Sequence, residues 1–67
     1  MTPDSFRETL AGLGLSQARL GRLLGVDKMT PSRWATGDAP IPRAVELLLW
    51  AMAEGGVTLA ELEAVGL

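Results

Sequence analysis

The sequence predicts a small all-α domain of five short helices. Apolar residues recur at spacings of three and four, and no run of alternating β-branched residues indicates a strand. Glycine and proline residues stand where helices would begin or end. With 67 residues, 48% of them apolar, the chain has enough material for one small core. We therefore expect a single domain over residues 1–67.

The first two helices are expected to begin at capping residues. Thr2 can cap a helix that has Pro3 at its first position, where the missing N–H costs no hydrogen bond. Phe6 begins the buried stripe of this helix, which ends in a glycine-rich segment. Ser16 caps the second helix, which runs to about Leu24.

A third helix is expected over residues 28–36, after a tight turn at Gly25. Gly21 allows the second and third helices to cross closely. The inward positions are large and apolar: Leu20, Leu24, Val26 and Trp34.

The start of the third helix has two interpretations. If Asp27 is the cap, Pro31 is the fourth helical residue and removes the first hydrogen bond within the helix. If Thr30 is the cap, Pro31 opens the helix, and Lys28 and Met29 lie in the turn. The first interpretation is favoured, with an irregular first turn.

The fourth helix, over about 42–54, is apolar on two faces. One stripe is expected to face the core: Val45, Leu48, Leu49 and Met52. Leu47, Trp50 and Ala51 fall on the other side, so both faces need cover. Thr58 and Glu61 have the spacing of a capping box for a fifth helix. The four glutamates from residue 44 onward are expected to be solvated: Glu46, Glu54, Glu61 and Glu63.

Charge is unevenly distributed along the chain. The net charge is −2, but residues 16–43 hold five of the six basic residues and carry +3, whereas residues 44–67 carry −4. This asymmetry favours one face for an anionic partner. The chain has no cysteine or histidine, and its acidic residues are not accompanied by a nucleophile. We expect no catalytic residues, metal or cofactor, and thus no enzyme.

The segment 16–37, SQARLGRLLGVDKMTPSRWATG, resembles the helix-turn-helix of the phage repressor and Cro family, also called the xenobiotic-response-element family. The matching elements are Leu15-Ser16-Gln17, Leu20-Gly21, Leu23-Leu24-Gly25-Val26, Ser32-Arg33-Trp34 and Gly37, followed by Pro42. The resemblance covers about residues 5–54 and implies a lambda-repressor-like fold. Pro31 departs from the pattern, since the family usually has valine or isoleucine there.

The resemblance implies a transcriptional regulator whose third helix enters the major groove of double-stranded DNA. The residues implied for base contacts are Lys28, Met29, Thr30, Ser32 and Arg33. The residues implied for contacts to the DNA backbone are Ser16, Gln17, Arg19, Thr36, Gly37 and Arg43. Minimal proteins of this kind act as repressors in phage and mobile-element operons, often of their own genes.

A homodimer on an inverted repeat is expected, because a single helix with a few base contacts cannot select one genomic site. The expected dimer surface consists of Leu47, Trp50, Ala51, Leu59, Leu62, Val65 and Leu67. The alternative for the fourth helix is that the fifth helix covers its second face within one chain. The alternative function is a protein-interaction module that keeps the helix-turn-helix shape without reading DNA. No small-molecule ligand and no membrane segment are expected, and the expected location is the cytoplasm.

Overall fold

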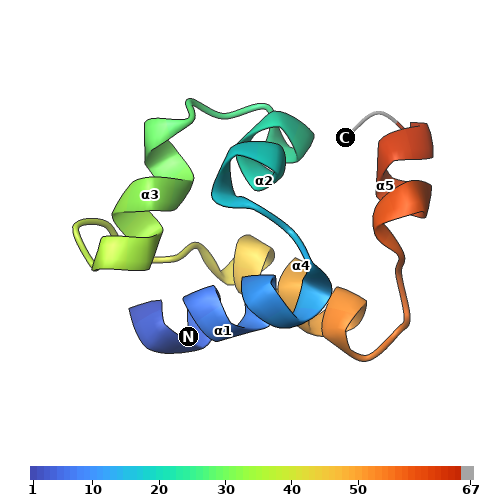
Figure 1. Ribbon diagram of the computed structural model, residues 1–67, viewed down its shortest axis with the longest axis horizontal. Helices are drawn as coiled ribbons and strands as arrows, with labels where there is room; N and C mark the ends of the chain where they lie inside the picture. The colour runs from blue at the N-terminus through green and yellow to red at the C-terminus, as the bar shows by residue number, and fades with distance from the viewer. Residues whose placement is uncertain (66–67) are drawn as a thin grey trace.

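The computed structural model describes residues 1–65, apart from the side chains of Leu59 and Val65. These residues form five helices and no strand, so the all-α prediction is confirmed (Figure 1). The helices are α1 (Pro3–Leu13), α2 (Gln17–Leu24), α3 (Met29–Thr36), α4 (Arg43–Ala53) and α5 (Leu59–Val65). Thr2 and Ser16 cap α1 and α2 as predicted, since their hydroxyl oxygens accept hydrogen bonds from the N–H groups of Ser5 and Arg19.

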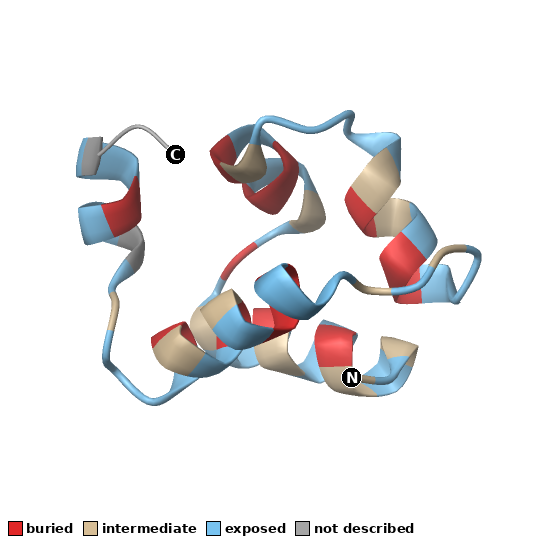
Figure 2. Ribbon diagram, turned by 180° about the vertical axis from the view of Figure 1, so that it is seen from behind, coloured by how far each residue is buried: buried red, intermediate tan, exposed pale blue. Residues whose placement is uncertain are grey.

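The first four helices pack around one core. Helix α1 packs against α3 and α4, and α2 packs against α3. In Figure 1, α1 and α4 lie below α2 and α3, and α5 stands to one side after a long connection. The buried residues lie on the segments where these helices approach one another (Figure 2). The most enclosed apolar side chains of this core are Phe6, Leu20 and Leu49, with no exposed surface.

Trp34 belongs to the core, as predicted. Its side chain is 5% exposed and meets the Phe6 ring edge to face, with ring centroids 6.0 Å apart and planes at 88°. Such aromatic pairs contribute about 0.5–1.5 kcal/mol beyond the area that they bury. This contact fixes α3 on α1.

The crossing of α2 and α3 depends on Gly21 and Pro31. A Cβ at Gly21 would lie 3.4 Å from Pro31 Cγ and 3.7 Å from the carbonyl oxygen of Val26. Pro31 is fully buried at this crossing. Gly25, with φ of 70°, turns the chain out of α2. Val26 is 39% exposed, so its predicted inward position is wrong, because its side chain leaves the crossing after this turn.

The effect of a substitution at Gly21 on stability should depend on the size of the new side chain. Gly21→Ala is expected to be neutral or stabilising, because the new Cβ makes an ordinary contact and alanine favours helix by about 1 kcal/mol. Gly21→Val must displace Pro31 and should cost about 1–3 kcal/mol in the free energy of unfolding. Gly12→Val in α1 is the control, since a Cβ there meets nothing within 4 Å. Equal urea midpoints for the two valine variants would contradict the close crossing.

Helix α3 begins at Met29, which agrees better with the Asp27 interpretation than with a Thr30 cap. The Asp27 carboxylate accepts a hydrogen bond from the Met29 N–H at 3.1 Å, and the Asp27 carbonyl accepts one from the Thr30 N–H at 2.9 Å. Lys28 lies in the turn just before the helix. Lys28 already has helical torsions (φ −56°, ψ −26°), so a donor at position 31 would reach the Asp27 carbonyl, four residues back. Pro31 has no N–H, and that carbonyl accepts the Thr30 N–H instead, so the first turn is irregular, as predicted.

Helix α5 is attached to the core through Leu62. Its side chain is 7% exposed and belongs to the core cluster, so its predicted place in a dimer surface is wrong. Thr58 and Glu61 form the predicted capping interaction, in which the Glu61 N–H donates to the Thr58 hydroxyl at 3.1 Å. Glu63 accepts hydrogen bonds from the Arg19 guanidinium at 2.7 and 3.0 Å and so connects α5 to α2.

Candidate nucleic-acid interface

Helix α3 presents one polar face to solvent. Its buried side chains are Pro31, Trp34 and Ala35, and the opposite side of the helix carries Met29 and Arg33. Met29 is 47% exposed, and Arg33 is exposed one helical turn further on. Thr30 and Ser32 are half-buried at the edges of this face, and Lys28 is exposed just before the helix. All five predicted base-contacting residues therefore have some access to solvent.

The basic residues from Arg19 to Arg43 differ in their partners. Arg22, Lys28 and Arg33 are exposed, and none of them forms an ion pair with a carboxylate in the described part of the chain. Arg19 and Arg43, predicted to contact the DNA backbone, are held by Glu63 and Glu46 respectively. Arg22, Lys28 and Arg33 are thus the cations that an anionic partner meets without breaking a described ion pair.

The N-terminus of α2 also offers neutral hydrogen-bond donors. The Ser16 hydroxyl oxygen accepts the Arg19 N–H at 3.1 Å, which leaves its own hydrogen free to donate. Gln17, the first residue of α2, is half-buried. Backbone N–H groups in the first turn of a helix lack intrahelical partners and favour anions.

The C-terminus of α3 is anchored to α1. Arg7 donates hydrogen bonds to the carbonyl oxygen of Ala35 and to the carboxylate of Asp4. Thr36 donates its hydroxyl hydrogen to the Arg33 carbonyl at 3.2 Å. Gly37, with φ of 86°, ends the helix. The sequence does not predict this role of Arg7, because its acceptor is a backbone carbonyl at the end of α3 and not a charged side chain.

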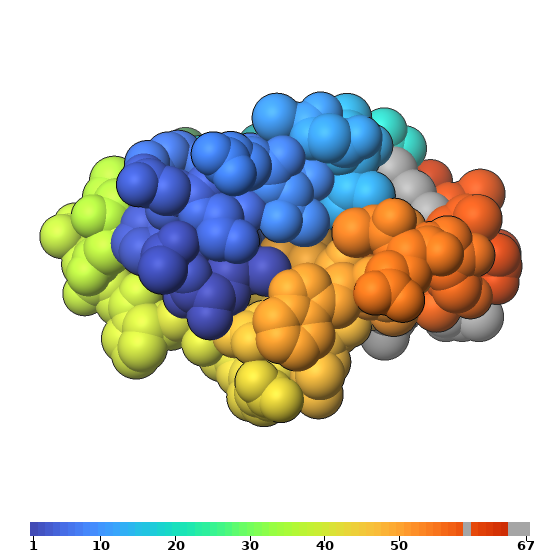
Figure 3. All heavy atoms as spheres, turned by 90° about the horizontal axis from the view of Figure 1, so that it is seen from below, coloured from blue at the N-terminus to red at the C-terminus, as the bar shows by residue number. Residues whose placement is uncertain are grey.

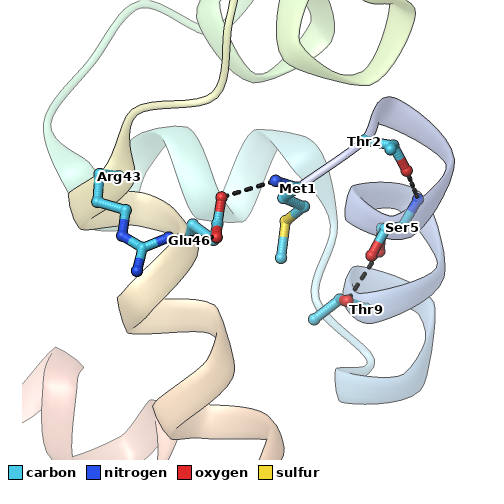
Figure 4. Close-up of polar contacts among 6 residues, drawn as sticks. All are labelled: Met1, Thr2, Ser5, Thr9, Arg43 and Glu46. Carbon is cyan, nitrogen blue, oxygen red and sulfur yellow. Dashed lines mark hydrogen bonds and ion pairs between the residues drawn. The ribbon is translucent and has the colours of Figure 1, made fainter.

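Glu46 is buried, so the prediction that it is solvated is wrong. Its carboxylate binds the N-terminal ammonium of Met1 at 2.7 Å and the Arg43 guanidinium at 3.0 Å, from opposite sides (Figure 4). The ammonium hydrogen bond, despite the opposing effect of burial, lowers the pKa of Glu46 below its ordinary value, and Arg43 adds to the lowering. The spacing of Arg43 and Glu46 is visible in the sequence, but the Met1 contact spans 45 residues.

Acidification should weaken this contact and destabilise the fold. Because the pKa of Glu46 is lower in the folded chain, its contribution is complete above the unfolded value of about 4.3 and is lost as pH falls through the folded value. Glu46→Gln should lower the urea midpoint at pH 7, and its difference from the native chain should shrink below pH 4. Glu8→Gln, at an exposed position of α1, is the control and should change the urea midpoint little at either pH. If the difference in urea midpoint between Glu46→Gln and the native chain were the same at both pH values, the ion pair would be contradicted.

The outer face of α4 remains uncovered by the described residues. Leu47 is 49% exposed and Trp50 is 45% exposed, while Ala51 beside them is half-buried. The alternative that the fifth helix covers Leu47 and Trp50 is therefore not what the structure shows. In Figure 3, α4 (yellow to orange) reaches the surface beside α1 (blue). The side chains of Leu59 and Val65 and the whole of Leu67, also predicted for the dimer surface, lie outside the described residues.

The longest helices of the described chain, α1 and α4, have 11 residues each, and none is long and apolar enough to cross a membrane. The described residues also contain no cluster of acidic side chains able to hold a metal ion. Comparison with known proteins finds no family model that matches the chain, and no curated protein or solved structure that matches it.

Proposed function

We propose that this chain is a sequence-specific DNA-binding regulator of the phage repressor and Cro type, with α2 and α3 as its helix-turn-helix. The observation that carries the proposal is the outer face of α3, where Met29 and Arg33 are exposed opposite the buried Trp34. An α-helix fits the major groove of B-DNA, where an arginine can bind the O6 and N7 atoms of guanine. The Met29 side chain suits contact with a thymine methyl group.

Electrostatics also favours an anionic partner. Arg22, Lys28 and Arg33 have no described carboxylate partner, so a phosphate adds attraction without displacing an acidic residue. Ser16 and Gln17 at the start of α2 supply hydrogen-bond donors for the DNA backbone. Four of the eight acidic residues of the chain lie in residues 44–67, in α4, α5 and their connection. Helix α3 itself carries no acidic residue, so the negative net charge does not lie on its outer face.

A homodimer completes the proposed function. Base contacts that each discriminate by about 1–3 kcal/mol select a genomic site only when two copies of α3 act together. A twofold dimer reads an inverted repeat whose half-sites are about 34 Å apart. Leu47 and Trp50 supply an exposed apolar surface for that dimer. By occupying a promoter, such a dimer would act as a repressor, including of its own gene.

Selection of binding sites from a random duplex pool tests the proposal. We expect enrichment of an inverted repeat with fixed spacing, with affinity that falls steeply as salt rises because counterions are released from DNA. A single enriched half-site would support DNA reading and remove the dimer. No enrichment by folded protein would contradict the proposal and favour the protein-interaction module, for which the exposed apolar face of α4 is the motivating feature.

A further inference from the structure

The exposed apolar residues of α4 belong to a longer stripe with a charge at each end. Arg43, Leu47, Trp50 and Glu54 are separated by four, three and four residues, which places them on one helix face. All four are exposed. Arg43 is the first residue of α4, and Glu54 is its C-terminal cap. We call these four residues the α4 stripe.

Arg43 and Glu54 each lie at the end of α4 where the helix dipole disfavours their charge. The N-terminus of a helix carries partial positive charge and its C-terminus partial negative charge. Arg43 and Glu54 therefore each meet a partial charge of their own sign. A helix lying antiparallel against the α4 stripe, with the same sequence, would bring the opposite charge to each end.

We propose that two copies of this chain pair through antiparallel α4 helices, with Arg43 of each chain opposite Glu54 of the other. In this register the twofold axis passes midway between residues 48 and 49, and Leu47 of one chain faces Trp50 of the partner. Each residue of the α4 stripe then meets a complementary one. A parallel pairing would instead oppose arginine to arginine and glutamate to glutamate.

The contacts of Arg43 within one chain fit this pairing. Its guanidinium carbon lies 5.4 Å from the centroid of the Trp50 ring, and one nitrogen, Nη1, donates to Glu46 at 3.0 Å. The Arg43 side chain is still 71% exposed, so other N–H groups remain free to bind a partner's carboxylate. Arg43 is thereby held at the end of the apolar surface, and this role replaces its expected contact with the DNA backbone.

The pairing rests on the proposed function in that it specifies the dimer which that function requires, but it can be tested without DNA. Glu54→Lys is the sharpest variant, because lysine suits the C-terminus of its own helix and should not unfold the monomer. The substitution places a positive charge opposite Arg43 at both ends of the interface. We expect the dimer dissociation constant, measured by sedimentation equilibrium, to rise about tenfold or more. Glu8→Lys, with the same change in charge on α1, should leave it unchanged.

The double variant Arg43→Glu, Glu54→Lys reverses both pairs together and should restore dimerisation of the folded monomer, although it also removes the hydrogen bond from Arg43 to Glu46. Equal dissociation constants for Glu54→Lys and Glu8→Lys would overturn the register, as would a native chain that stays monomeric at millimolar concentration. Binding to a single DNA half-site distinguishes the two proposals. If Glu54→Lys weakens binding to the inverted repeat but not to the half-site, the pairing is supported. If the native chain binds neither DNA, the proposed function fails whatever the oligomeric state.

Discussion

Replacing Arg33 with alanine is expected to reduce the preference of the protein for its selected DNA site over random DNA. Arg33 is exposed on the outer face of α3 and forms no ion pair with a described carboxylate. A bidentate contact to guanine discriminates by about 1–3 kcal/mol, so the loss is about 5- to 150-fold for each half-site. The ratio of dissociation constants for selected and random duplexes, at one salt concentration, measures this loss directly.

Arg22→Ala is the matched control for Arg33→Ala. Arg22 is also exposed, lies on α2 and forms no ion pair with a described carboxylate, so its removal takes away the same charge. We expect it to weaken binding to both duplexes by similar factors, as the loss of a phosphate contact would. If Arg33→Ala also weakens binding to the selected and the random duplex by equal factors, Arg33 binds phosphate and does not read a base.

The two tryptophans should respond oppositely to replacement by alanine. Trp34 is 5% exposed and meets Phe6, so Trp34→Ala should lower the free energy of unfolding by about 3–5 kcal/mol. A domain of this size has about 3–10 kcal/mol in total. We therefore expect Trp34→Ala to be largely unfolded at 37 °C, with loss of the helical circular dichroism signal.

Trp50→Ala is the internal comparison. Trp50 is 45% exposed and contacts Arg43, so its removal should cost about 1 kcal/mol or less in the unfolding of dilute, monomeric protein. The unfolding midpoint of the native chain should rise with protein concentration because a dimer is stabilised by mass action, and that of Trp50→Ala should not. Similar losses of stability for both variants in dilute protein would contradict the assignment of Trp34 to the core and Trp50 to the surface.

The helices and most of the core could be predicted because their causes are local. Capping residues and terminal glycines determine the ends of α1 and α2, and the spacing of apolar residues identifies the inner faces. The exposed face of α3 follows from the same spacing, since Trp34 and Arg33 point in different directions. Burial of Trp34 could thus be predicted from the sequence.

The wrong predictions concern contacts between distant parts of the chain. Glu46 is buried because an ammonium 45 residues away compensates its charge, and Leu62 is buried because the connection after α4 returns α5 to the core. Val26 turns outward because of the path of the chain after Gly25. The partners of Arg19 and Arg43 depend on the same distant packing.

The position of α1 has a consequence for the order in which the chain becomes structured during synthesis. Its Phe6 packs on Trp34, and the Met1 ammonium binds Glu46, so α1 leaves the ribosome before the residues that it packs against. A helix of 11 residues is marginal alone in water. Residues 3–13 should therefore stay largely unstructured until α4 has emerged, and then fold together with α3 and α4 in one cooperative step.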